Sequence, residues 1–202
     1  MPVQGRGTGP SSTVHRGIQV FNRTPADTAR SWLLDCCVSH IWAERLVAHR
    51  PFPDTDALLA AADEASYDLL PAQRAAALAA ERPHGPHPAG VPAAALTALG
   101  AAHAAYESRF GRVFVICLDD HRPDEHLDQT LAGLRGRLGN DPDEERVVAA
   151  DELRRVARGR LARLVARIGA EEPDETPQGP GKAENSREFP DSGPTDSPYV
   201  PV

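Results

Sequence analysis

The sequence lacks an apolar run long enough to span a bilayer, and it has no N-terminal signal peptide. It contains only three cysteines, an odd number that does not suit a disulfide framework. It also lacks a basic excess, because the formal net charge of the 202 residues is −7. Duplex nucleic acid requires a basic surface, so a DNA-binding helical regulator is disfavoured. These absences predict a cytoplasmic protein with neither a membrane partner nor a nucleic-acid partner.

Both ends of the chain are poor in the large apolar residues that build a core. Residues 171–202 contain eight acidic residues, two basic residues and seven prolines, so they carry a net charge of −6. Residues 1–20 are rich in glycine and serine. Such compositions bury too little surface to offset the entropy lost on ordering. The sequence therefore predicts a disordered N-terminal tail at 1–20, one domain with one hydrophobic interior at 21–170, and a disordered, acidic, Pro-rich tail at 171–202.

Helical signals dominate the predicted domain. Its alanine-rich stretches have high helix propensity, and its leucines recur at helical spacing. Asp54 and Asp141 are typical N-caps, and Gly111 is a typical helix stop. The one strand-like run, residues 113–118, has no second run to pair with, so it is expected to be a buried extended connector or a short helical turn. The predicted fold class is all-α, a single-domain helical bundle.

The adjacent Cys36 and Cys37 have two interpretations. Their neighbours include Leu33, Val38 and Ile41, which are typical of a helical core. Free cysteine in such surroundings is usually a small buried hydrophobe, which favours structural thiols. A redox-active pair is the alternative.

Several stretches of the chain match the pattern of one enzyme family. They are Phe21-Asn22, Trp42-Ala43, Arg50-Pro51-Phe52, Tyr106 to Leu118, Arg135 to Glu145, and Glu152 to Leu161. Together they resemble the 2-oxo-4-hydroxy-4-carboxy-5-ureidoimidazoline (OHCU) decarboxylases, which form (S)-allantoin in urate breakdown. The resemblance implies the helical bundle of that family, a small-molecule ureidoimidazoline substrate, no cofactor and no metal. Dimers are common in this family, and the long helix expected at 142–168 is a candidate homodimer interface.

The chain departs from the family at the two catalytic positions. The family's helix ending Leu-Ala-Ala-His-Pro carries the catalytic histidine, and here the same place reads Leu-Ala-Ala-Glu81-Arg82. The family's Glu-Gln-Ala-Gly carries a partner glutamate, and here the residue at that place is His87. Histidine titrates near neutrality and suits proton donation, so His84 and His87 are candidates for a displaced catalytic acid. Glu81 becomes a candidate substrate-binding residue.

The resemblance also implies substrate-binding residues in the second half of the chain. Arg160 matches the family's substrate-binding arginine, whose guanidinium fork suits a carboxylate or ureido oxygen. The alternative is a solvated arginine on a charged helical face. Phe110-Gly111-Arg112-Val113-Phe114 matches the family's Phe-Gly-x-x-Phe, whose backbone binds substrate, so Phe110, Gly111 and Phe114 are further candidates.

Other interpretations of the histidine segment remain open. It can be a surface connector punctuated by prolines, in which His84 and His87 have no role. A metal site formed by these two with His103 or Glu81 matches no standard zinc spacing. Two functions therefore stand side by side: cofactor-free decarboxylation of OHCU to (S)-allantoin, and a catalytically inactive relative that keeps the fold as a ligand- or protein-binding module.

Overall fold

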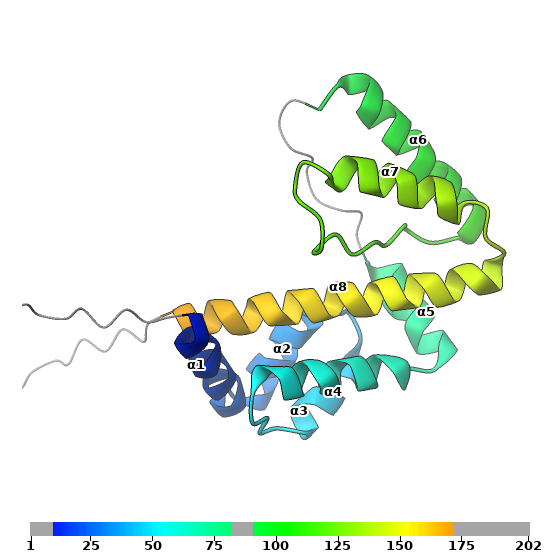
Figure 1. The fold of residues 1–202 in the computed structure, drawn as a ribbon. Helices are drawn as coiled ribbons and strands as arrows, with labels where there is room; N and C mark the ends of the chain where they lie inside the picture. The colour runs from blue at the N-terminus through cyan, green and yellow to red at the C-terminus, as the bar shows by residue number, and fades with distance from the viewer. Residues whose placement is uncertain (1–9, 82–90, 172–202) are drawn as a thin grey trace, which may run out of the picture. The chain divides into compact units, whose positions relative to one another are not determined.

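The computed structural model describes residues 10–81 and 91–171, with side chains from residue 15 onward. This part of the chain contains no strand and forms α1 (Pro10–Arg23), α2 (Ala26–Cys36), α3 (His40–Ala48), α4 (Thr55–Tyr67), α5 (Pro71–Ala80), α6 (Ala93–Phe110), α7 (His126–Arg137) and α8 (Pro142–Ala170) (Figure 1). The predicted all-α fold class is confirmed. His84, His87 and nearly all of the acidic segment lie outside the described residues. None of the described helices is both long and apolar enough to cross a membrane.

The helix limits follow the local signals in the sequence. Asp54 caps α4, since its Oδ1 accepts a hydrogen bond from the Ala57 amide at 2.8 Å. Asp141 caps α8 in the same way, by accepting from the amides of Asp143 and Glu144. Gly111 ends α6 with a φ of 66°, a left-handed conformation that favours glycine. These predicted starts and stops are confirmed.

The first helix begins earlier than the boundary expected at residue 21. Ile18 and Phe21 of α1 are buried against the rest of the molecule. A Cβ atom at Gly17 would lie 2.0 Å from the carbonyl oxygen of Val165, so α1 and α8 approach each other too closely for a side chain there. The absence of a side chain at Gly17 therefore permits the close packing of α1 on α8.

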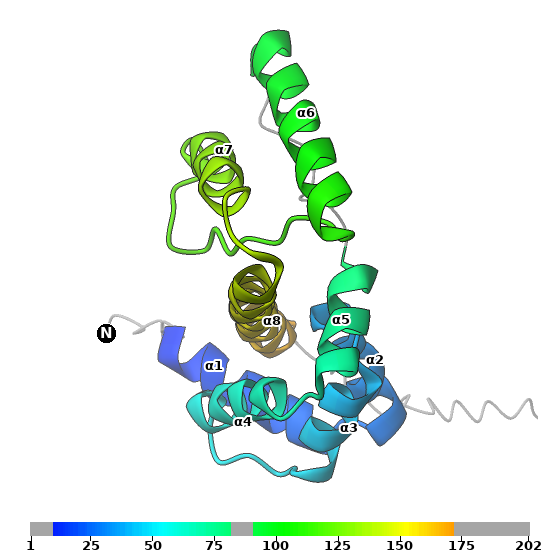
Figure 2. The same ribbon diagram turned by 90° about the vertical axis from the view of Figure 1, so that its right-hand side faces the viewer.

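The long helix α8 lies between two groups of helices, with α1–α4 on one side and the α6–α7 pair on the other (Figures 1 and 2). The first group and α8 share a cluster of buried side chains that includes Phe21, Trp42 and Leu161. A second, smaller cluster consists of Leu99, Tyr106, Phe114 and Leu134. Where one interior was expected, the buried side chains therefore form two clusters, because α6 and α7 pack mainly on each other.

Residues 113–118 form the buried connector that the sequence predicted, and they adopt neither helix nor strand. Side chains of two helices satisfy its backbone. Arg137 of α7 donates from Nη1 to the Val115 carbonyl at 2.7 Å, and Glu152 of α8 accepts from the Cys117 amide at 2.6 Å. The connector is thereby held against α8.

Candidate functional site

Arg160 of α8 and Glu81, the residue that follows α5, form a bidentate ion pair. The distances from Nη1 to Oε1 and from Nη2 to Oε2 are both 2.9 Å. Nη1 also donates to the carbonyl oxygen of Cys36, at the end of α2, over 3.1 Å. We call Arg160, Glu81 and the Cys36 carbonyl the Arg160 site. These contacts connect the C-terminal ends of α2 and α5 to the middle of α8.

The Arg160 site is largely shielded from water on the carboxylate side. The Glu81 side chain is 4% exposed and that of Arg160 is 36% exposed. The hydrogen bonds to Glu81 raise the pKa of the Arg160 guanidinium above its ordinary value. Paired bonds of this geometry are among the strongest polar contacts in proteins. Arg160 is therefore not a solvated arginine, and both of its outer nitrogens already have a carboxylate partner.

The two neighbouring thiols are buried beside this pair. Burial raises the pKa of Cys36 to about 11 and that of Cys37 to about 12. Both thiols are free and stay protonated near neutral pH. A reactive cysteine needs a lowered pKa, so the structure favours structural thiols over a redox pair.

Asp119, directly after the connector, contacts α8 one turn from Arg160. It forms an ion pair with Arg163, with Nη1 and Oδ1 2.8 Å apart. A Cβ atom at Gly159 would lie 1.8 Å from Oδ2 of Asp119, so the glycine leaves room for this carboxylate in the conformation that it adopts. A glycine inside a long helix costs about 1 kcal/mol relative to alanine. That isolated glycine was the signal in the sequence that a chain segment lies close by.

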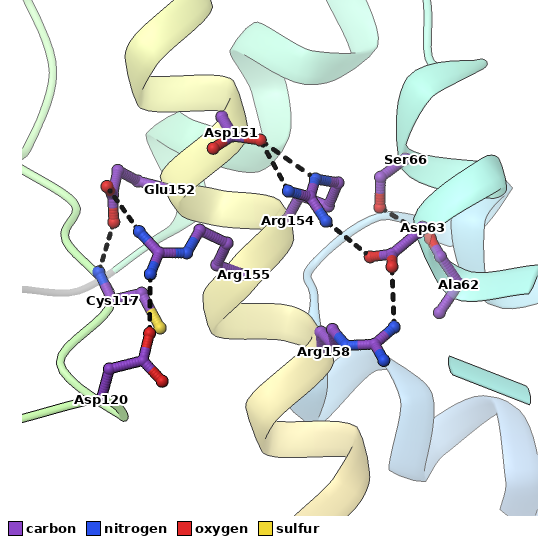
Figure 3. Close-up of polar contacts among 10 residues, drawn as sticks. All are labelled: Ala62, Asp63, Ser66, Cys117, Asp120, Asp151, Glu152, Arg154, Arg155 and Arg158. Atoms are coloured by element: carbon purple, nitrogen blue, oxygen red, sulfur yellow. Dashed lines mark hydrogen bonds and ion pairs between the residues drawn. The ribbon is translucent and has the colours of Figure 1, made fainter. Parts of the chain in front are cut away.

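The other arginines of this part of α8 also have carboxylate partners, several of which are drawn in Figure 3. The pairs are Arg154 with Asp63 and Asp151, Arg155 with Asp120 and Glu152, and Arg158 with Asp63. Asp63 belongs to α4 and Asp120 follows the connector. These ion pairs fasten α8 to the segments on either side of it, and the charged helical face is not simply solvated.

The predicted candidates Phe110, Gly111 and Phe114 lie in a different place. The ring of Phe114 meets that of Tyr106 edge-on, with centroids 5.0 Å apart, and Phe110 lies 4.8 Å from the same ring. The guanidinium of Arg137 lies 4.5 Å above the Phe114 ring. Phe114 belongs to the second hydrophobic cluster and Phe110 packs against it, whereas Gly111 is exposed.

Glu145 is the polar centre of that second cluster, and its side chain is 0% exposed. It accepts hydrogen bonds from the Tyr106 hydroxyl, from Arg137 Nη2 at 2.5 Å and from Asn140 Nδ2 at 2.8 Å. Burial and then the bond to Glu145 raise the pKa of Tyr106 above its ordinary value. The stretch from Arg135 to Glu145 thus links α6, α7 and the start of α8 through one buried network.

The structure brings together only some of the predicted site residues. Glu81 and Arg160 are in contact, whereas Phe110 and Phe114 pack near Glu145, fifteen residues before Arg160 on α8. At the helical rise that separation is about 22 Å. His103 lies near the second cluster too, with its ring 6.0 Å from that of Phe114. Among the described residues, no group of histidine, cysteine and acidic side chains is arranged to hold a metal ion.

Comparison with known proteins gives one family and two related structures. The family profile described as OHCU decarboxylase matches residues 22–87 and 87–162. The chain is similar to a crystal structure of (S)-allantoin synthase, with 21% identity and a TM-score of 0.57 over 73% of this chain and 53% of that chain. It is similar to a crystal structure of OHCU decarboxylase in the presence of (S)-allantoin, with 24% identity and a TM-score of 0.57 over 67% of this chain and 97% of that chain.

At these identities the two structures establish the shared fold. The chain spans only about half of the (S)-allantoin synthase structure. No curated protein matches the sequence.

Proposed function

Because the chain belongs to the OHCU decarboxylase family, we propose that it decarboxylates OHCU to (S)-allantoin without a cofactor. In this proposal Arg160 holds the substrate, and a histidine of the segment that follows Glu81 donates the proton. The observation that carries the proposal is the contact between Glu81 and Arg160. It anchors the start of the histidine segment at the arginine that matches the family's substrate-binding residue.

The anchor limits how far the two histidines can lie from Arg160. His84 follows Glu81 by three residues, so its Cα atom is at most about 11 Å from that of Glu81. His87 follows by six residues, which allows about 22 Å. A proton donor must come within hydrogen-bond reach of its target. The shorter tether favours His84 over His87 as the donor.

The reaction needs little beyond these groups. The bond between the ring and the carboxylate breaks, carbon dioxide leaves, and the ring takes up the electron pair. A proton delivered to one face of the ring then sets the chirality of allantoin. A fixed cation such as Arg160 stabilises the negative charge that develops before protonation. Glu81 keeps the guanidinium of Arg160 in position until an oxygen of the substrate replaces one of the two carboxylate oxygens of Glu81.

The test is a coupled assay in which fresh OHCU is generated from urate and the product is followed by circular dichroism. Spontaneous decay gives racemic allantoin, so a protein-dependent (S)-allantoin signal supports the proposal. His84→Asn should reduce the rate at least tenfold, because the proton donor is lost. His49→Asn, which alters an exposed histidine at the end of α3, is the matched control and should leave the rate unchanged.

A second function is favoured by the same ion pair. Glu81 stands where the family has its catalytic histidine, and it already occupies both outer nitrogens of Arg160. A protein with this arrangement can keep the fold as a ligand-binding module without turnover. Calorimetric binding of (S)-allantoin, together with no turnover in the wild type and a gain of turnover in Glu81→His, would favour this function.

A further inference from the structure

A cavity of about 220 Å³ lies where α5, the residue after Gly111 and the first turns of α8 meet. Figure 2 looks onto this side of the molecule, with α5 beside α8. Arg74 of α5, Arg112 just before the connector, and Asp143 and Arg146 of α8 contribute to its walls. Arg146 and Arg160 are fourteen residues apart on α8, or about 21 Å. The cavity is therefore separate from the Arg160 site.

Each arginine between residues 154 and 163 has a carboxylate partner from another segment of the chain. The arginines of this cavity do not have such partners among the described residues. Arg146 pairs with Asp143 on its own helix. Arg74 uses Nε and Nη2 on one acceptor, the Leu69 carbonyl, at 3.3 and 2.9 Å. Arg112 has its Nε buried, and within the described residues that atom has no hydrogen-bond partner. The walls of the cavity thus include three arginines and only one acidic residue, Asp143.

The buried Nε of Arg112 is not reachable from the cavity, so the positive charge of the walls is what favours a ligand there. An anion in the cavity would balance the excess positive charge of the three arginines over the single aspartate. The guanidinium fork matches the planar oxygens of a carboxylate or phosphate. The remaining wall includes Leu78, which is buried, and Val147, which is exposed at the rim, so it suits an apolar group.

We infer that this cavity binds a small organic anion, with its carboxylate or phosphate head at Arg74 and Arg112 and its apolar part against Leu78 and Val147. The volume equals that of about seven water molecules at ~30 Å³ each. That space admits a ligand with a single ring. The inference does not rest on any reaction at the Arg160 site.

The probes are benzoate and phenyl phosphate, titrated calorimetrically into the full chain, with uncharged benzamide as the ligand control. At least one anion should bind, and benzamide should not. Arg112→Gln should weaken binding at least tenfold, because one of the positive charges in the cavity wall is removed. Arg135→Gln, which changes an exposed arginine of α7 outside the cavity, is the matched control and should bind as the wild type does.

Val147→Glu provides a second test that leaves the arginines in place. Val147 is 68% exposed, so a carboxylate there should not disturb folding. Its negative charge at the rim should weaken binding of either anion at least fivefold by repulsion. Comparison of the two probes identifies the preferred head group. Absence of binding for both anions, or binding that neither Arg112→Gln nor Val147→Glu weakens, would overturn the inference.

Discussion

At the scale of single residues, Glu81 is the feature that separates this chain from the pattern of its family. The two oxygens of a carboxylate match the two outer nitrogens of a guanidinium, whereas an imidazole suits proton exchange near neutral pH. Glu81 therefore suits the task of holding Arg160 better than that of donating a proton. Any proton donor has to come from another residue, which is why the histidines three and six residues further on matter.

Glu81→Gln tests the competition between Glu81 and the substrate. The amide can still accept one hydrogen bond, but it no longer neutralises Arg160. We expect the KM for OHCU to fall severalfold, because the guanidinium becomes available to the substrate anion. The free energy of unfolding should fall by about 1–3 kcal/mol as the largely buried pair is lost. Glu64→Gln, at an exposed carboxylate of α4, is the control. A higher KM in Glu81→Gln would instead indicate that Glu81 itself contacts substrate.

The buried thiols predict how stability depends on pH. The ordinary thiol pKa is near 9, and burial raises those of Cys36 and Cys37 to about 11 and about 12. The unfolded chain thus loses these protons first. The stability that the protonated thiols contribute is fully present below pH 9 and is lost as pH rises toward 11 and 12.

Urea unfolding between pH 7 and 10.5 measures this effect. Above pH 9 the wild type should lose up to about 1.4 kcal/mol per pH unit for each thiol. The Cys36→Ala/Cys37→Ala double variant should lose correspondingly less over the same interval, whatever its absolute stability. Equal slopes for the two proteins would show that the thiols do not titrate as burial requires.

Glu145 is the residue on which the second cluster depends. Its fully buried carboxylate faces Arg137, whose side chain is 11% exposed, so removing it leaves a buried charge without a partner. Glu145→Ala should lower the free energy of unfolding by about 3–5 kcal/mol. Glu144→Ala, at the exposed neighbouring position, should cost less than about 1 kcal/mol. Similar losses in chemical denaturation of both variants would contradict the role assigned to the network.

At the scale of helices, α8 is held by ion pairs as well as by apolar packing. Asp63 of α4 accepts from Arg154 at 3.0 Å and from Arg158 at 2.7 Å, so one carboxylate joins two turns of α8 (Figure 3). Asp63→Asn should lower the free energy of unfolding by about 1 kcal/mol, with a smaller effect at high salt, because the pairs are only partly buried. Glu64→Gln on the same helix should have no such effect in parallel urea titrations at low and high salt.

The sequence predicted the helix limits better than the contacts between helices. The caps at Asp54 and Asp141 and the stop at Gly111 depend on residues within one turn, so local patterns are enough to find them. The partners of Arg160 and Arg154 lie 79 and 91 residues away. No local pattern specifies such pairs. For the same reason, the glycine- and serine-rich composition of residues 1–20 did not reveal that the segment from Pro10 onward forms α1, which packs on α8.

At the scale of the whole molecule, the chain keeps the fold of the OHCU decarboxylase family, while in the proposed function Glu81 stands in place of the family's catalytic histidine. The buried network at Glu145 and the contacts of α8 stabilise the fold whether or not the site is active. A fold can persist after its activity changes. The question of activity therefore depends on the Arg160 site and the segment that follows Glu81.

The most direct measurement is the chirality of allantoin formed from fresh OHCU, followed by circular dichroism for the wild type and for Arg160→Gln. Our account predicts an (S)-allantoin signal from the wild type and at least a tenfold lower rate in Arg160→Gln. Arg167→Gln, an exposed arginine two turns further along α8, should match the wild type. Racemic product at the spontaneous rate with wild-type protein would contradict the proposed decarboxylase and would leave the ligand-binding function.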